Sequence, residues 1–154
     1  MEEIADLLRV GRSQIVDAQW ADNGPGWIVV LLGSAAAVLE LDPVRAYAER
    51  IDLGVVGPYP SGHPLAFEVR AFFTDHNKSA REDPVTGSLN AAVAQWLLAT
   101  GLATAPCLAS QGTCLGRTGR IDNAIARQFN ERPRKTLGFH TPAEMFSECV
   151  ASTG

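Results

Sequence analysis

The sequence has little charge and no long apolar run. Charged residues make up 19% of the 154 residues and hydrophobic residues 46%, whereas an intrinsically disordered chain is richer in charge and poorer in apolar side chains. The strongest apolar run, 27–32, is six residues long, against the roughly 20 that a membrane-spanning helix requires. The composition therefore excludes a disordered chain and a helical membrane span.

Cysteine and basic charge are also scarce. The three cysteines, Cys107, Cys114 and Cys149, have spacings that match no C-x-x-C or zinc-ribbon motif. We expect them to be reduced thiols, with a reactive cysteine as the alternative that the sequence leaves open. Because the cysteine spacings match no metal-binding motif, we expect no bound metal. The net charge of -4 does not favour a protein that binds nucleic acid with its whole surface.

The chain is long enough for one domain, and its first residues do not resemble a leader. A chain of 16.4 kDa buries about two thirds of its unfolded surface on folding, so it needs no metal or disulfide to hold a core. The first ten residues, MEEIADLLRV, are acidic and amphipathic, whereas a secretory leader begins with basic residues and continues into an apolar segment. We expect a cytoplasmic protein.

Apolar spacing predicts both helices and strands. The segment 88–100 is the most apolar of the expected helices, and because it is apolar on most faces it should lie inside the core. The strands 15–20 and 27–32 flank a turn rich in glycine and proline and should form a hairpin, and 75–87 is expected to be a polar loop. The other expected helices are 2–9 and 42–50, and the other expected strands are 38–41, 54–57, 65–74, 107–110 and 113–115.

The strongest chemical signal is the segment EDPVTGS, which begins at Glu82 and ends at Ser88. It is a tight turn that leads into the start of an apolar helix, where unpaired N–H groups and the helix dipole favour an anion such as a carboxylate. Thr86, Gly87 and Ser88 would supply hydroxyls and backbone amides, and Glu82 or Asp83 would take part in proton transfer. The alternative is an ordinary helix cap in ordinary loop sequence.

EDPVTGS is followed by an Ala-rich apolar helix and then by QGTCLGRTGRI, and it is preceded by VRAFF. These motifs together resemble the phenazine-biosynthesis isomerase (PhzF-like) family, which has the diaminopimelate-epimerase-like fold. The resemblance covers about residues 2–121 and implies an α/β fold in which a curved mixed sheet wraps around a central helix at about 88–100. Proteins of that family are about twice this length and have two similar halves, of which this chain resembles the second.

The resemblance also implies a site and a reaction. Asp83 and Ser88 match the catalytic positions, and Glu82, Thr86 and Gly87 match the substrate-binding turn. The implied chemistry is proton transfer on a small carboxylated metabolite, without cofactor or metal. The family's main acid/base Glu and its companion His belong to the first half and have no counterpart here, so impaired activity is expected. A homodimer would supply a second half-site.

The composition changes near residue 121. Residues 1–121 contain 9 basic and 13 acidic side chains, and residues 122–154 contain 4 of each. The tail, with its RPRKTLGF and TPAE motifs, resembles the C-terminal end of insertion-sequence transposases. We therefore expect one division of the chain at about 121, with two helices in the tail. The basic residues Arg132, Arg134 and Lys135 are balanced by acidic ones and should attract phosphate weakly.

Two further functional hypotheses remain open beside the isomerase. The chain would be a non-catalytic remnant of a gene fusion that retains at most weak carboxylate binding, because the half with the acid/base Glu is absent. Alternatively, the tail would bind DNA, although its charge balance and the net charge of the chain favour a protein without a nucleic-acid partner.

Overall fold

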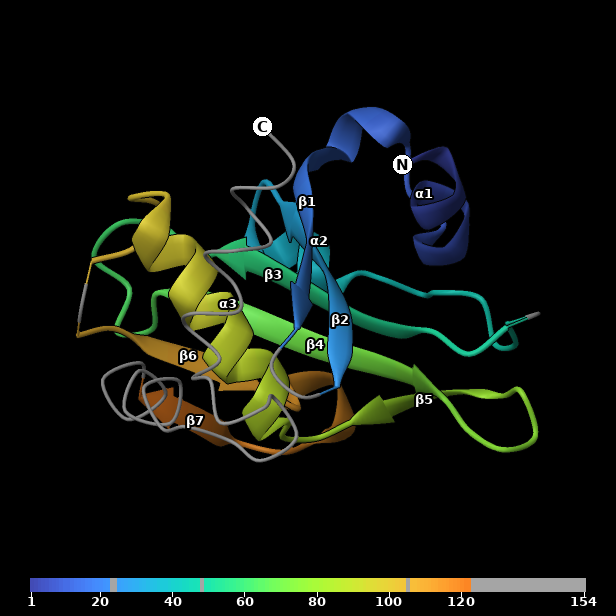
Figure 1. The fold of residues 1–154 in the computed structure, drawn as a ribbon. Helices are drawn as coiled ribbons and strands as arrows, with labels where there is room; N and C mark the ends of the chain where they lie inside the picture. Colours follow the sequence, from blue (N-terminus) through green and yellow to red (C-terminus); the bar gives the residue numbers. More distant parts are fainter. Residues whose placement is uncertain (23–24, 48, 105, 123–154) are drawn as a thin grey trace.

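One mixed seven-stranded sheet organises the part of the chain that the computed structural model describes, residues 1–22, 25–47, 49–104 and 106–122 (Figure 1). The helices are α1 (Glu2–Leu8), α2 (Ala35–Leu39) and α3 (Gly87–Ala99), with short 3-10 turns η1 (Arg12–Gln14) and η2 (Thr113–Leu115). The strands are β1 (Ile15–Asp22), β2 (Gly26–Leu32), β3 (Asp52–Pro58), β4 (Phe67–Thr74), β5 (Ala80–Asp83), β6 (Leu108–Gln111) and β7 (Gly119–Asp122).

The strand order is β1-β2-β3-β4-β6-β7, with β5 also paired to β4. The pairs β2–β3 and β4–β6 are parallel, and the other pairs are antiparallel. Parallel neighbours need a crossover rather than a hairpin. In this chain α2 lies in the connection from β2 to β3, and β5 and α3 lie in the connection from β4 to β6.

Strand β4 has two partners along one of its edges, and this brings the ends of two other strands together. Its first part pairs with β6, ending at Val69 opposite Gln111. Its second part pairs with β5, beginning at Ala71 opposite Asp83. Asp83 and Gln111 are therefore neighbours across a gap of one β4 residue, although they are far apart in the sequence.

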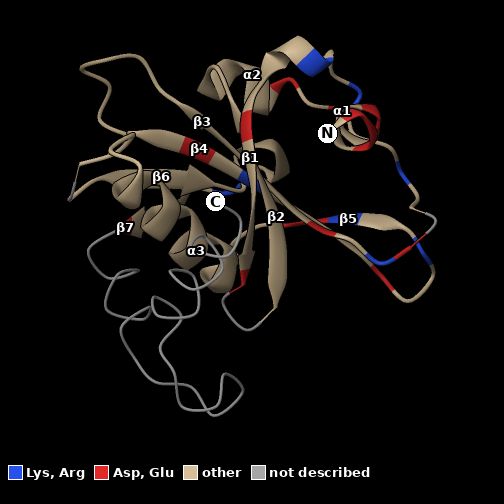
Figure 2. Cartoon of the chain, turned by 45° about the horizontal axis from the view of Figure 1, so that its top comes forward, with Lys and Arg blue, Asp and Glu red and all other residues tan. Residues whose placement is uncertain are grey.

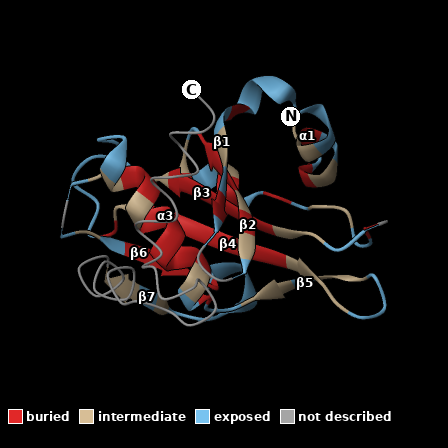
Figure 3. Ribbon diagram, in the orientation of Figure 1, coloured by how far each residue is buried: buried red, intermediate tan, exposed pale blue. Residues whose placement is uncertain are grey.

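The two faces of the sheet carry separate apolar layers. On one face, side chains of the central strands pack against α3, among them Val29, Val69 and Ala71. On the other face, Val30, Phe72 and their neighbours pack with α1 and the segment after β2. Successive strand residues point to opposite faces. Central strands that are buried on both faces therefore have almost continuously apolar sequences. Figure 3 shows this burial through the sheet and α3.

Helix α3 lies against the sheet as a buried element, as the sequence predicts. Its buried side chains include Leu89, Trp96 and Leu97, and burial of each large apolar side chain contributes about 1.5–3 kcal/mol. The helix ends at Ala99 with Thr100 as its C-cap, and Gly101 follows with a φ of 72°, a left-handed conformation that glycine adopts without steric cost. Figure 2 shows that charged residues lie mainly in the loops and at the ends of elements, with few inside the sheet.

The predicted hairpin, the helices 2–9 and 88–100, and the strands around 15–20, 27–32, 54–57, 65–74 and 107–110 are confirmed. The strand expected over 38–41 is wrong, because Ala35–Leu39 is helical. The hydroxyl oxygen of Ser34 caps this helix by accepting a hydrogen bond from the backbone N–H of Ala37 at 3.1 Å. A capped run of alanines favours a helix more than β-branched Val38 favours a strand.

The helix expected over 42–50 is also wrong. The backbone N–H of Val44 donates to the carbonyl of Leu7, and the N–H of Tyr47 donates to the carbonyl of Lys78. These tertiary hydrogen bonds replace the i to i−4 bonds of a helix, so the Asp-Pro start signal is overridden. The polar loop expected over 75–87 contains β5, and the strand expected over 113–115 is the 3-10 turn η2.

Candidate active site

The EDPVTGS segment places an aspartate beside the first turn of α3. The Thr86 hydroxyl donates to Asp83 Oδ2 at 2.8 Å, and the backbone N–H of Val85 donates to Asp83 Oδ1 at 3.4 Å. Thr86 is the N-cap residue of α3, but its side chain makes no capping hydrogen bond to the helix. The hydroxyl is directed to the carboxylate, so Asp83 has a defined position at the beginning of a 13-residue helix.

Gln111, at the end of β6, holds this turn against the sheet. Its Nε2 donates to the Asp83 carbonyl at 2.9 Å and to the Thr86 hydroxyl oxygen at 3.0 Å. Its Oε1 accepts from the Thr86 N–H at 3.1 Å and from Asn90 Nδ2, and Asn90 Nδ2 also donates to the Thr86 carbonyl at 2.8 Å. The side chain of Gln111 is 0% exposed, and both ends of its amide are hydrogen-bonded, as burial of a polar group requires.

Sequence reasoning did not identify Gln111 and Asn90 as parts of the site. Gln111 lies within the QGTCLGRTGRI motif, and Asn90 is a buried amide in a mostly apolar helix that also contains Gln95. An amide on the buried side of a helix indicates that a hydrogen-bond partner exists. The sequence could not identify that partner, because the contact depends on the pairing of β5 and β6 with the same edge of β4.

Gly112 allows β6 to approach the turn. Its φ is 87°, and a Cβ at this position would lie 2.7 Å from the Pro84 carbonyl oxygen. A side chain would therefore be both strained and in contact with rigid backbone. Glycine at this position brings the strand close enough for Gln111 to reach Asp83 and Thr86.

Ser88 connects the helix start to β2. Trp27 Nε1 donates to Ser88 Oγ at 3.2 Å, and Trp27 is buried in the core layer beside α3. Trp27 therefore packs in the core and also orients the hydroxyl of Ser88. Gly87 is exposed at the first position of the helix, so Asp83, Thr86, Gly87 and Ser88 are grouped as the motif suggests.

Glu82 lies on the opposite face of the sheet from Asp83. It pairs with Phe72 across β4, whereas Asp83 pairs with Ala71, and directly paired residues share a face. The Glu82 carboxylate accepts two hydrogen bonds from the Arg70 guanidinium, at 3.0 Å from Nε and 2.7 Å from Nη2. The carboxylate is thus already bound within the fold, and its expected contact with substrate stays a prediction.

Arg70 has further contacts on that face. Its Nη1 donates to the carbonyls of Val38 and Leu41, at 3.2 and 2.7 Å, and its guanidinium lies 4.8 Å from the centre of the Phe72 ring. Burial by itself would lower the pKa of Arg70, but the hydrogen bonds and the charge of Glu82 raise it. The guanidinium therefore remains protonated and joins the segment after β2 to β5.

The described residues contain no group of three or more His, Cys, Asp or Glu side chains that could hold a metal ion. No described helix is long and apolar enough to cross a membrane.

The Cys114 thiol lies 3.5 Å from the Leu39 carbonyl, and burial raises its pKa. At neutral pH it is therefore mainly the thiol, which is less nucleophilic than a thiolate.

These observations define an α/β protein with a polar site at the start of a helix that packs on a mixed sheet. The family model described as phenazine biosynthesis-like protein (PhzC-PhzF) matches residues 1–138, and the chain belongs to this family. None of the curated proteins compared with the chain is significantly similar to it.

A solved structure supports the fold. The crystal structure of the Bacillus anthracis phenazine biosynthesis protein, of the PhzF family, matches with a TM-score of 0.65 and 13% sequence identity. The match covers 79% of this chain and 45% of that protein, so this chain spans less than half of its relative. At this identity the likeness concerns the fold alone. The family match extends past 121, the expected division of the chain, and the tail helices and basic tail residues lie outside the described residues.

Proposed function

We propose that the chain carries one half of the active site of a proton-transfer isomerase or epimerase that acts on a small carboxylated metabolite without a cofactor. The observation that carries the proposal is the position of Asp83. Its carboxylate accepts the Thr86 hydroxyl hydrogen at the start of α3, and the chain belongs to the phenazine biosynthesis-like family.

Each residue of the turn has a distinct proposed role. Asp83 assists proton transfer at the carbon next to the substrate carboxylate. Gly87 and Ser88 hold that carboxylate with the backbone amides and hydroxyl of the first helical turn, where the dipole of α3 adds favourable charge. Thr86 acts through Asp83, because its hydroxyl is engaged with that carboxylate. Glu82 supports the turn from the other face of the sheet through Arg70.

A complete site requires an opposing half. The chain corresponds to 45% of the matched structure, and the sequence contains no counterpart of the family's acid/base Glu. We propose that two copies pair so that the starts of both α3 helices face one cleft, which would make the site symmetric. Such a site contains Asp83 and Ser88 twice, and its activity is expected to be weak.

Deuterium incorporation tests the proposal. The protein is incubated with small unsaturated or α-substituted carboxylic acids in heavy water, and exchange at the α-carbon is followed by NMR. Incorporation should fall at least about a hundredfold in Asp83→Asn, the usual scale for general acid or base catalysis, and remain unchanged in the control Asp6→Asn on α1. Incorporation that is equal in Asp83→Asn and the intact protein would refute the role of Asp83.

The second candidate is a non-catalytic remnant of a gene fusion with weak carboxylate binding, divided into residues 1–121 and a transposase-like tail, 122–154. The resemblance of the tail to the end of insertion-sequence transposases favours it. In this case carboxylic acids bind without deuterium incorporation. Light scattering adds a second test, because a strict monomer has no opposing half and would support the remnant. Salt-dependent retention on DNA would instead support a function of the tail.

A further inference from the structure

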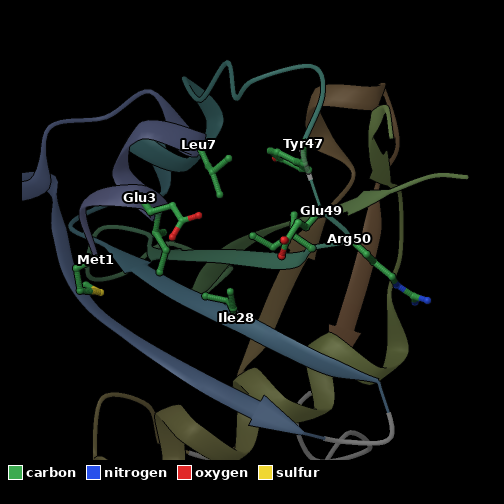
Figure 4. A pocket seen from close by; sticks show the side chains of 9 residues that line it. Met1, Glu3, Leu7, Ile28, Tyr47, Glu49 and Arg50 are labelled. Carbon is green, nitrogen blue, oxygen red and sulfur yellow. The ribbon is translucent and has the colours of Figure 1, made fainter. Parts of the chain in front are cut away.

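A second candidate site lies on the sheet face opposite α3. A cavity of about 560 Å3 is lined by residues of α1, by β2 and by the segment that leads into β3 (Figure 4). Ile4 and Ile28, which line it, pack against the apolar layer on the α1 side of the sheet. The volume lies within the range of about 300–1,000 Å3 that is typical of small-molecule sites.

A buried hydroxyl without a partner marks the inner part of this cavity. Tyr47 is 4% exposed, and its hydroxyl has no hydrogen-bond partner. Figure 4 shows its ring directed into the space between Leu7 of α1 and the segment that leads into β3. Burial raises the pKa of Tyr47, so the phenol is neutral at neutral pH. A buried polar atom without a partner is unfavourable, and a ligand atom in the cavity would remove this defect.

The charged side chains around the cavity are arranged for a cation. The carboxylates of Glu3, on α1, and Glu49, on the facing segment, point toward the same space, whereas the Arg50 side chain points away (Figure 4). Arg50 instead lies 3.5 Å from Asp52 and is largely exposed. Two carboxylates therefore approach the cavity from opposite sides, and the basic side chain that borders it is directed to solvent.

We propose that this cavity binds a small organic cation, a primary ammonium group on an apolar body. The ammonium donates hydrogen bonds to the carboxylates of Glu3 and Glu49 and to the hydroxyl oxygen of Tyr47. The hydrocarbon body packs against the aliphatic side chains of Leu7 and Ile28. The site is independent of Asp83, which lies on the other face of the sheet.

Hexylammonium and hexanol provide a matched pair of probes, because they share the apolar body and differ in charge. Binding to the full chain is followed by two-dimensional NMR of the backbone amides. Hexylammonium should shift signals of residues 2–7 and 49–51, and hexanol should bind at least about threefold more weakly. Equal binding of the two probes, or no shift in either segment, would overturn the proposal.

Variants separate the contributions of the three polar groups. Glu3→Gln and Glu49→Gln should each weaken hexylammonium binding about threefold, since both carboxylates are exposed. Tyr47→Phe should weaken it by up to about tenfold, because its hydroxyl is buried. Glu2→Gln, the exposed neighbour of Glu3, is the matched control. An equal loss in Glu2→Gln would mean that the net charge of α1, and not this cavity, attracts the cation.

The proposal is distinguishable from the isomerase proposal. Asp83→Asn should leave hexylammonium binding unchanged, and Tyr47→Phe should leave deuterium incorporation unchanged. If Tyr47→Phe does not fold, Glu49→Lys replaces it, because position 49 is exposed and tolerates the change. A lysine there should abolish hexylammonium binding through repulsion, and retention of binding would contradict the proposal.

Discussion

Two adjacent carboxylates, Glu82 and Asp83, lie on opposite faces of the sheet in different environments. Glu82 is bound by the guanidinium of Arg70 on one face of the sheet, where the two side chains are 10% and 7% exposed. Asp83 is half-buried on the other face and is held by one hydroxyl and one backbone amide. Strand alternation separates them. A carboxylate that is neutralised by a buried cation supports structure, whereas one held mainly by a neutral hydroxyl remains available for chemistry.

The largest expected loss of stability comes from breaking the buried ion pair between Arg70 and Glu82. Arg70→Met leaves Glu82 buried without its cation and removes the hydrogen bonds to the carbonyls of Val38 and Leu41. The free energy of unfolding should fall by about 3–5 kcal/mol, as measured by urea denaturation. Arg81→Met, which breaks the pair between the exposed Arg81 side chain and Asp75, is the control and should cost at most about 1 kcal/mol. Equal losses would remove the distinction between the two pairs.

A smaller loss is expected when the support of Asp83 is removed. Gln111→Leu keeps a side chain of similar size but leaves the buried amide of Asn90 and the backbone N–H of Thr86 without this acceptor. The cost should be about 2–3 kcal/mol, again by urea denaturation. Deuterium incorporation should fall as well, because the turn is no longer held against β6. A stable but inactive Gln111→Leu would show that the network positions Asp83 without stabilising the fold.

Thr86→Val tests the contact to Asp83 directly. The change removes the hydroxyl that donates to the carboxylate and preserves the shape of the side chain. The free energy of unfolding should fall by about 1 kcal/mol. Deuterium incorporation should also decrease, because the hydroxyl no longer holds the Asp83 carboxylate. Thr86→Ser retains the hydroxyl and is the matched control. If valine and serine have the same effect on incorporation, the hydroxyl does not orient Asp83.

An effect confined to alkaline pH concerns Glu68, a third carboxylate, which shares a face with Glu82. Glu68 is 0% exposed, and its Oε2 accepts a hydrogen bond from the Tyr59 hydroxyl at 2.9 Å. Burial, followed by the hydrogen bond and charge of Glu68, raises the pKa of Tyr59 to about 12. Because the folded pKa lies above the ordinary value of about 10, the contribution to stability is complete below pH 10 and is lost as pH rises toward 12.

Phenolate absorbance measures this titration. The wild type should show a component with a pKa near 12 that is absent from Tyr59→Phe, with Tyr47 as the remaining tyrosine of the two. A component that is lost in Tyr59→Phe but titrates near the ordinary value of about 10 would contradict the Tyr59–Glu68 hydrogen bond.

Much of the architecture could be predicted from local patterns, and the failures have identifiable causes. Helix α3 and the β1–β2 hairpin were predictable because strong apolar periodicity and turn residues coincide in each. The segment 42–50 has a good helix start signal, but its backbone groups bond to Leu7 and Lys78 instead. Strand β5 could not be predicted, because it is polar and pairs at the edge, where the apolar pattern is absent.

The candidate site was predictable only as a motif. The grouping of Asp83, Thr86, Gly87 and Ser88 follows from their spacing at a helix start. The different environments of Glu82 and Asp83 could not be predicted, because they depend on which face each residue occupies in β5. The role of Gln111 was equally hidden, since its partners are more than twenty residues away in the sequence.

Local sequence is sufficient to determine the α/β character of this chain, its buried helix and the polar turn at the start of that helix, because these depend on periodicity and neighbouring residues. Tertiary structure alone decides which polar groups meet. Strand β4 accepts β5 and β6 along one edge, and this pairing places Gln111 beside Asp83 and Arg70 beside Glu82. Contacts of this kind arise from strand register and from the need to satisfy buried polar groups, neither of which is encoded in adjacent residues.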